Sequence, residues 1–268
     1  MPFFDRRRPR VYAHRGGSAL GPENTIAAFD IGLAAGADGL ELDVHLSADG
    51  IPVVMHDPTL DRTTDATGLL SAKSADELAR VDAGYRFTNG TGGAPFRGQG
   101  IGVPTLIDVL RRYPGVPTIV ELKVDTEDCG IRVAQAVCEA DATDRVCLAG
   151  FGLRSARGAR QALPSAGASA CQVEVRRALH CSWVGWPVGT VAYHGYQVPE
   201  RSGWLRVVSR RFVRQAHQAG LAVEVWIVDE PPDMERLLAW GVDGLISNRP
   251  DLAVAVRGDY LQRQTKAL

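Results

Sequence analysis

The sequence has no excess of charge of either sign. Its 268 residues include 30 Lys and Arg against 31 Asp and Glu, so the formal net charge at pH 7 is −1. A chain with this balance generates no overall field that attracts nucleic acid. We therefore expect no nucleic-acid partner.

Cysteine is scarce, and its spacing follows no motif. The five cysteines are odd in number and lack the CxxC spacing of zinc sites and redox motifs. They also provide no regular disulfide framework of the kind that small secreted proteins use. This usage is typical of a protein in a reduced compartment.

Long apolar runs and internal repeats are absent as well. No apolar run reaches the roughly 18 residues that indicate a membrane span. The stretch from Met1 to Asp5 is too short for the apolar part of a signal peptide. We expect a cytoplasmic protein without stable membrane insertion, and the sequence makes no prediction of its oligomeric state.

What the sequence contains is an alternation of two kinds of segment. Short apolar runs alternate with amphipathic helical stretches, which predicts βα units around a parallel sheet. Eight strands are predicted, at residues 11–14, 39–44, 118–123, 146–151, 169–174, 190–194, 222–228 and 243–247. Helices are predicted at 24–35, 131–140, 211–219 and 234–240, with helix-ending glycines at Gly36, Gly220 and Gly241. Eight parallel strands close a (β/α)8 TIM barrel, and we expect residues 1–268 to form one such domain.

Residues 57–104 interrupt this rhythm. The segment is rich in Gly, Thr and Asp, and only residues 74–80 have helical character. A structureless loop of this length would be unusual, so we predict a small insertion after the second strand, on the catalytic face. The second barrel helix then follows at 105–113. Tyr85, Phe87 and Phe96 lie among the glycines of the insertion and suggest an apolar lid.

Residues 41–57 carry polar groups where a core strand would have apolar ones. They read as two short runs around a Ser-Ala-Asp-Gly turn, and Glu41 and Asp43 share one face of the first run. A hairpin closed by residues 47–50 places Leu46 opposite Ile51 and Glu41 opposite His56. This register predicts two carboxylates and an imidazole on one patch.

Three carboxylates from neighbouring strands suggest a metal site. Glu121 ends the third predicted strand and joins Glu41 and Asp43 at the carboxyl ends of the strands, where barrels carry their functional groups. Carboxylate oxygens suit one divalent cation, Mg²⁺ or Ca²⁺. The alternative is a pair of structural salt bridges, Glu41 with Lys123 and Glu121 with Arg15. The three carboxylates together, beside two histidines, favour the metal.

Histidines and cations complete the predicted site. His14 and His56 are suited to proton transfer near neutral pH. Arg15 and Lys123 are cationic donors that an anionic group such as phosphate requires. A metal, two cations and two histidines indicate phosphoryl-ester chemistry rather than carbonyl chemistry.

The motifs resemble those of the glycerophosphodiester phosphodiesterase family. They occur in the same order as in that family and span nearly the whole chain. The N-terminal pieces are His-Arg-Gly at 14–16, Pro-Glu-Asn-Thr at 22–25, Glu-Leu-Asp-Val at 41–44, His-Asp at 56–57 and Glu-Leu-Lys at 121–123. Residues 57–64 and 103–106 resemble the start and end of that family's insertion, and Trp226 and residues 241–246 resemble its last two strands.

The resemblance implies a barrel enzyme that hydrolyses glycerophosphodiesters to sn-glycerol 3-phosphate and an alcohol. It implies the following roles: Glu41, Asp43 and Glu121 bind the metal, His14 and His56 are the acid/base pair, Arg15 and Lys123 contact phosphate, and Trp226 walls the pocket.

The C-terminal half departs from the family pattern on the substrate side. Trp226-Ile227-Val228-Asp229 replaces Trp-Thr-Val-Asn, Ser247-Asn248 replaces Thr-Asp, and Gly150-Phe151 replaces Ser-Phe. The leaving alcohol therefore stays open. The alternative function is phospholipase D-type hydrolysis of lysophospholipids at the same site. A non-catalytic phosphate-binding barrel and a metal-dependent sugar isomerase fit the retained residues less well.

Overall fold

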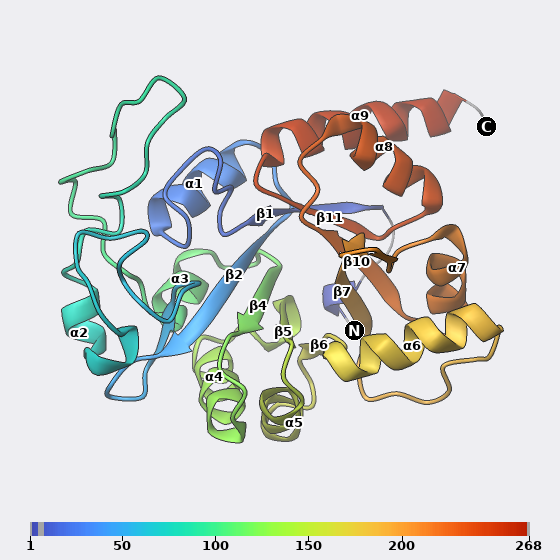
Figure 1. Cartoon of the computed structure of the whole chain (residues 1–268), viewed down its shortest axis with the longest axis horizontal. Helices are drawn as coiled ribbons and strands as arrows, with labels where there is room; N and C mark the ends of the chain where they lie inside the picture. The colour runs from blue at the N-terminus through green and yellow to red at the C-terminus, as the bar shows by residue number, and fades with distance from the viewer. Residues whose placement is uncertain (1, 5–7, 267–268) are drawn as a thin grey trace.

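The computed structural model describes residues 2–4 and 8–266, and its central feature is a ring of parallel strands (Figure 1). Around the ring the order is β6 (Gly167–Ala168), β5 (Val146–Gly150), β4 (Thr118–Leu122), β2 (Gly39–Leu46), β1 (Arg10–His14), β11 (Gly244–Ser247), β10 (Ala222–Trp226) and β7 (Gly195–Pro199). A parallel bridge between Ser169 and Gly195 joins the two end strands. The predicted (β/α)8 barrel is confirmed.

Helices cover the outside of the ring (Figure 1). They are α1 (Ile26–Ala34), α3 (Leu106–Arg112), α4 (Glu127–Glu139), α5 (Leu153–Ala162), α6 (Gln172–Val184), α7 (Arg210–Gln218), α8 (Pro231–Trp240) and α9 (Pro250–Lys266). Thr25, Thr105, Thr126 and Ser209 cap four of them by accepting a hydrogen bond from the backbone N–H three residues on. The helix-ending positions predicted for Gly36, Gly220 and Gly241 are confirmed by their positive φ angles of 90°, 76° and 86°. Among the helices described, none combines the length and apolarity needed to cross a bilayer.

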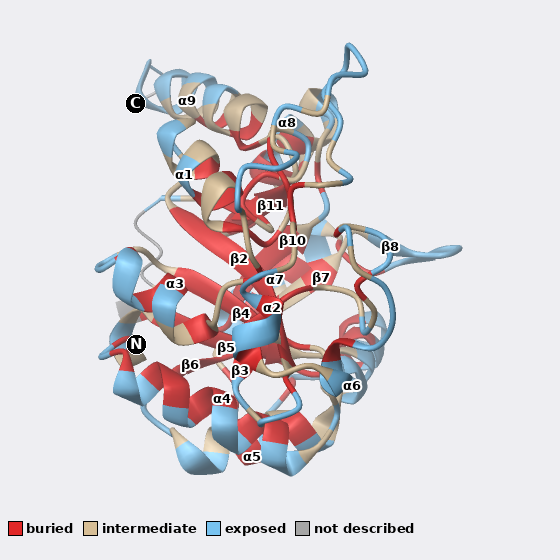
Figure 2. Ribbon diagram, turned by 90° about the vertical axis from the view of Figure 1, so that its left-hand side faces the viewer, coloured by how far each residue is buried: buried red, intermediate tan, exposed pale blue. Residues whose placement is uncertain are grey.

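The strands are largely buried (Figure 2), and apolar side chains pack on both of their faces, in two layers and a small central core. The layers lie between strands and helices, whereas Tyr12, Ile119, Cys147 and Ile246 pack inside the barrel. These interior side chains fill the barrel below the ends of the strands. The barrel is therefore a packed core, and a ligand can enter only at its rim.

Two predicted strands are wrong in position. Residues 169–174 alternate like a strand, but Gln172 begins the 13-residue helix α6, and the Glu174 carboxylate accepts a hydrogen bond from the Cys171 N–H to cap it. Residues 190–194 form a loop, and β7 begins only at Gly195. Gln197 in the middle of β7 points its polar side chain into the barrel interior, where an apolar residue is expected. This break in the apolar pattern hides the strand from prediction.

The hairpin after β2 exists, but its predicted register is wrong by one residue. β3 (Pro52–Val54) pairs antiparallel with β2, with Leu46 opposite Pro52 and Val44 opposite Val54. The turn is longer by one residue than predicted because the Ser47 hydroxyl bonds both the N–H and the C=O of Ile51. A slip of one residue exchanges the two faces of a strand. Glu41 therefore does not face His56 across the ladder, and His56 lies beyond the end of β3.

The segment 57–104 packs around an apolar cluster of its own, which contains Leu60, Leu70 and Leu78. It contains the short helices η2 (Leu70–Ala72) and α2 (Ala75–Leu78), and it forms the large loop beside α1 and α3 (Figure 1). The aromatic residues that could form an apolar lid make local contacts: the rings of Phe87 and Phe96 meet edge to face, and Arg97 lies 4.3 Å over the ring of Tyr85.

Candidate active site

A cavity of about 380 Å³ opens at the carboxyl ends of the strands. Seven of the eight predicted site residues line it: His14, Arg15, Glu41, His56, Glu121, Lys123 and Trp226. The eighth, Asp43, is 1% exposed and lies directly behind the wall. The structure thus brings together the complete set from the ends of β1, β2, β4 and β10 and from the residues after β3.

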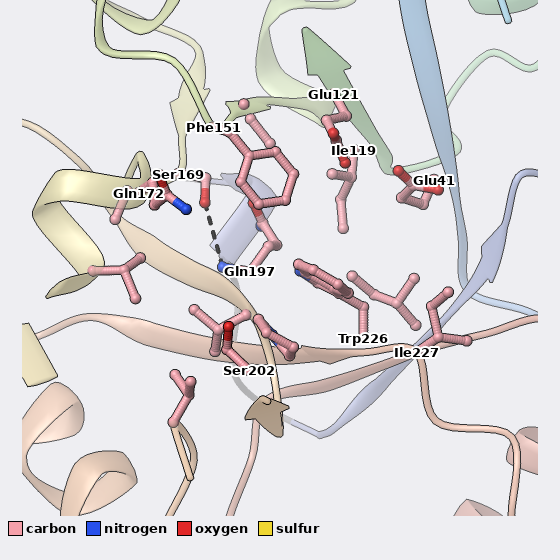
Figure 3. A pocket seen from close by; sticks show the side chains of 18 of the residues that line it. Glu41, Ile119, Glu121, Phe151, Ser169, Gln172, Gln197, Ser202, Trp226 and Ile227 are labelled. Atoms are coloured by element: carbon pink, nitrogen blue, oxygen red, sulfur yellow. Dashed lines mark hydrogen bonds between the residues drawn. The ribbon is translucent and has the colours of Figure 1, made fainter. Parts of the chain in front are cut away.

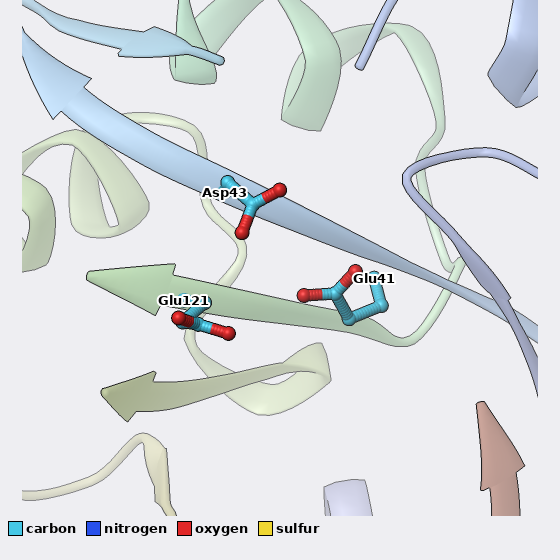
Figure 4. A group of neighbouring side chains, drawn as sticks. All are labelled: Glu41, Asp43 and Glu121. Atoms are coloured by element: carbon cyan, nitrogen blue, oxygen red, sulfur yellow. The ribbon is translucent and has the colours of Figure 1, made fainter. Parts of the chain in front are cut away.

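Three carboxylates converge on one side of the cavity (Figure 4). Asp43 on β2 is the register partner of Glu121 on β4, and Glu41 lies one pleat earlier on the same face of β2. One oxygen from each lies within 4.8 Å of the other two. Burial raises the pKa of Glu41 well above its ordinary value, and the charges of Asp43 and Glu121 add to the shift. Three hard oxygen donors whose charges repel one another fit a divalent metal ion.

Lys123 and Arg15 lie beside this cluster but do not neutralise it fully. Lys123 Nζ lies 2.9 Å from Glu121 Oε1 and 3.2 Å from Asp43 Oδ1, and Arg15 Nε lies 3.0 Å from Asp43 Oδ2. Burial alone would raise the pKa of Asp43, but Lys123 and Arg15 outweigh it and lower that pKa. The alternative salt bridges, Glu41 with Lys123 and Glu121 with Arg15, are not the pairs that form among the described residues.

The turn after β1 positions Arg15 through an uncommon backbone. Arg15 and Asn24 have φ angles of 50° and 59°, which non-glycine residues seldom adopt outside functional sites. Gly16 allows the turn to pack on α1, because a Cβ there would lie 2.7 Å from the backbone of Ala28. The buried Asn24 amide donates to Asp43 Oδ2 at 2.9 Å. The turn therefore fixes both the arginine and one carboxylate.

His14 is held by a polar relay from the last strand. Its Nδ1 lies 2.6 Å from Asn248 Oδ1, and the Asn248 amide donates to Asp229 Oδ2 at 2.7 Å. The amide oxygen can only accept, so Nδ1 carries the proton and Nε2, 3.8 Å from Glu41, keeps its lone pair. Burial and the charge of Arg15 lower the pKa of His14. Asn248 and Asp229 differ from the residues of the family pattern, and sequence reasoning assigned them no role.

His56 has a carboxylate partner instead. Its Nδ1 lies 2.6 Å from Asp57 Oδ1, Arg62 binds Asp57 at 2.6 Å, and Arg62 also binds Glu23 at 2.7 Å. The hydrogen bonds from Arg62 hold the pKa of Asp57 well below its usual range. Sequence reasoning found His56 but missed this chain of charges. Its only signal was that Glu23, Asp57 and Arg62 all belong to motifs shared with the family.

The side of the cavity away from the carboxylates is largely apolar (Figure 3). Trp226 and Phe151 meet edge to face with ring centroids 6.0 Å apart, and Leu179 and Leu205 add aliphatic surface. The polar groups that line this side are Ser169, Gln172, Arg176, Gln197 and Ser202. The cavity therefore joins a charged half to an apolar half.

A buried carboxyl group beneath the apolar half fixes Gln197. Glu224 Oε2 accepts a hydrogen bond of 2.5 Å from Gln197 Nε2, and the thiol of Cys147 lies within 3.8 Å of the same amide. Burial raises the pKa of Glu224 from its ordinary value of 4.5 to about 7. The group is therefore largely protonated in the folded protein below neutral pH.

Replacing Glu224 by Gln is expected to stabilise the protein at pH 8 and to change little at pH 5. Between pH 4.5 and 7 the folded wild type holds a proton that the unfolded chain releases. Its stability therefore falls as the pH rises through this window, by up to about 3 kcal/mol. The glutamine removes this loss. Urea unfolding of both proteins at pH 5 and pH 8 measures the difference in their free energies of unfolding. An equal difference at the two pH values would contradict the raised pKa of Glu224.

The fold and the site define a class: a (β/α)8-barrel enzyme with an acidic cluster that could bind a metal ion, two histidines and two cations around one cavity. The family assignment follows from comparison. The model of the Glycerophosphoryl diester phosphodiesterase family matches residues 14–252, so the chain belongs to this family. It is a glycerophosphodiester phosphodiesterase, a phosphoric diester hydrolase.

Individual relatives agree with this assignment. A glycerophosphodiester phosphodiesterase from Caldanaerobacter subterraneus is 31% identical over 250 residues, which are 91% of this chain and 96% of the relative. The crystal structure of an Agrobacterium tumefaciens glycerophosphodiester phosphodiesterase has a TM-score of 0.75 at 28% identity and covers 92% of this chain and 99% of that one. The structure of an Oleispira antarctica phosphodiesterase in complex with the product sn-glycerol-3-phosphate has a TM-score of 0.73 at 24% identity, with 93% and 96% covered.

Proposed function

We propose that this enzyme hydrolyses glycerophosphodiesters to sn-glycerol 3-phosphate and an alcohol in a metal-dependent reaction with histidine acid/base catalysis. One observation carries the proposal: the three carboxylates lie within 4.8 Å of one another at the cavity that His14 and His56 also line. sn-Glycerol 3-phosphate is also the product that the Oleispira antarctica structure contains.

Glu41, Asp43 and Glu121 would hold one Mg²⁺ or Ca²⁺. When bound, such an ion polarises a phosphoryl oxygen and neutralises the charge that develops in the transition state. Arg15 and Lys123 line the same part of the cavity and contact the remaining phosphate oxygens. Both side chains already lie beside carboxylates, so the phosphate enters a site whose cations are fixed in place.

The two histidines differ in their partners, and this difference assigns their roles. His14 has a neutral amide at Nδ1 and a lowered pKa, so its Nε2 accepts a proton from the nucleophile. His56 has the Asp57 carboxylate at Nδ1, which compensates the charge of an imidazolium, so it donates a proton to the leaving oxygen. The nucleophile is water or the glycerol 2-hydroxyl, the latter through a cyclic phosphate.

The apolar half of the cavity favours a second candidate, phospholipase D-type hydrolysis of lysophospholipids. Phe151 and Trp226 together with Leu179 and Leu205 form an apolar wall. Glycerophosphocholine has only glycerol and choline beside its phosphate and leaves much of this wall without a partner, whereas the acyl chain of a lysophospholipid covers it.

The test is hydrolysis of glycerophosphocholine and of lysophosphatidylcholine, each before and after exhaustive chelation. We expect choline release to fall by about 100-fold on chelation and to return with Mg²⁺ or Ca²⁺. Full turnover after chelation would contradict the metal. Faster choline release from lysophosphatidylcholine than from glycerophosphocholine would favour the second candidate, and no release from either would contradict both.

A further inference from the structure

Exposed apolar side chains gather along one half of the cavity rim. Trp204 is 102% exposed, and Phe151, Val173, Leu205 and Ile227 are between 41% and 50% exposed. They come from the ends of β5 and β10, from the start of α6 and from the segment after β7. A group of large apolar side chains beside a binding cavity indicates contact with an apolar partner.

The most prominent part of this rim is a hairpin. β8 (Arg201–Ser202) pairs antiparallel with β9 (Leu205–Arg206), and Gly203, at φ 58°, allows the tight turn that places Trp204 at the tip. The hairpin projects from the body as a fully exposed segment (Figure 2). Ser202 and Leu205 line the cavity, whereas Trp204 is not among its lining residues. The tryptophan therefore contributes neither to the core nor to the cavity wall.

The chain segment that contains the hairpin is strongly positive although the whole chain is nearly neutral. Residues 151–215 contain ten arginines and only two acidic residues, both glutamates. Glu174 pairs with Arg160 and Glu200 pairs with Arg236, so both glutamates are already neutralised. Exposed arginines lie at the start of α5, on α6, on the hairpin and at the start of α7: Arg154, Arg176, Arg201, Arg206 and Arg210.

We propose that the rim and the β8–β9 hairpin dock on the surface of an anionic phospholipid bilayer. Tryptophan prefers the headgroup region of a bilayer, because its apolar ring contacts the acyl chains there while its N–H donates to a polar partner. The arginines pair with lipid phosphates. One tryptophan and a basic patch give reversible surface binding, which differs from insertion. The cavity mouth beside Leu205 then faces the membrane and receives substrate from it.

Vesicle sedimentation tests the proposal with the full-length protein and without turnover, so its result is independent of the proposed function. The probes are phosphatidylglycerol vesicles and phosphatidylcholine vesicles. The variants are Trp204→Ala, Arg201→Gln and the matched control Trp186→Ala. Trp186 is also an exposed tryptophan, at 67%. It follows the C-terminal end of α6, whereas Gln172 at the N-terminal end of that helix lines the cavity.

We expect wild type and Trp186→Ala to bind phosphatidylglycerol vesicles and to be released by 0.5 M salt. Trp204→Ala lowers the partition coefficient about tenfold and Arg201→Gln about fivefold, and neither changes hydrolysis of a water-soluble diester. Failure of wild type to bind, or equal binding by Trp204→Ala, would overturn the proposal. Equal binding of wild type to phosphatidylcholine and phosphatidylglycerol vesicles would also overturn it. If Trp204→Ala lost self-association but kept vesicle binding, the hairpin would contact a second copy of the chain and not a membrane.

Discussion

Replacing His14 or His56 by Gln is expected to lower kcat for glycerophosphocholine by about 10³-fold, because each imidazole transfers a proton in the proposed reaction. The folded structure should survive both changes. His56 is partly exposed, and glutamine at position 14 can still donate to Asn248 Oδ1. Steady-state kinetics together with circular dichroism measures both effects.

The matched control is His217→Gln. His217 also pairs with an aspartate, with its Nε2 2.8 Å from Asp243 Oδ2, but it lies on α7 away from the cavity lining. Its kcat should equal that of wild type. A loss of activity in His217→Gln comparable to the other two would mean that the decrease reflects damage to the fold and not missing proton transfer.

Leaving-group dependence separates the two histidines. A diester with a nitrophenol leaving group needs no protonation of the departing oxygen, so the His56 variant should recover to within about tenfold of wild type. The His14 variant should stay about 10³-fold impaired, because the nucleophile still has to lose its proton. If each variant lost equal activity on both substrates, the distinction between the two histidines would be contradicted. If the His14 variant recovered instead of the His56 variant, the two roles would be reversed.

The sequence predicted the residues of the candidate site because they break the apolar pattern of strands. Glu41, Asp43 and Glu121 lie on strands that are mostly apolar, and His14 ends one, so polarity at a buried position is itself a signal. β7 shows the opposite effect: Gln197 interrupts its apolar alternation, and the strand was placed five residues too early. The same kind of departure thus revealed the site and concealed a strand.

The residues that the sequence did not assign lie in loops or depend on packing. Asp57 and Arg62 belong to a polar segment in which charged residues are ordinary, and only folding brings them to Glu23. The register of the β2–β3 hairpin depended on one hydroxyl, that of Ser47, which extends the turn. Trp204 carried no signal, because a single tryptophan in a loop gives no indication of its exposure. The cytoplasmic location stays a prediction.

Replacing Glu41 by Gln is expected to impair turnover strongly and at the same time to stabilise the metal-free protein. Glu41 is 4% exposed; it accepts a hydrogen bond from the Arg15 backbone N–H at 3.3 Å, whereas His14 Nε2, at 3.8 Å, carries a lone pair and donates no proton to it. Neither compensates a buried carboxylate beside two others. The isosteric amide removes that repulsion, so unfolding in chelator should cost about 1–3 kcal/mol more than in wild type.

The stability of Glu41→Gln should then no longer respond to metal. Wild type should gain about 2.7 kcal/mol when Mg²⁺ or Ca²⁺ is present at 100 times its Kd, whereas the variant loses this gain and about 10³-fold of kcat/KM. Thermal unfolding with chelator and with each metal measures both. The control Glu174→Gln should show the opposite sign, since it breaks a satisfied pair with Arg160 at 2.8 Å and keeps the metal response. A less stable metal-free Glu41→Gln that still responds to metal would show that Glu41 is a structural residue and that the ion is held elsewhere.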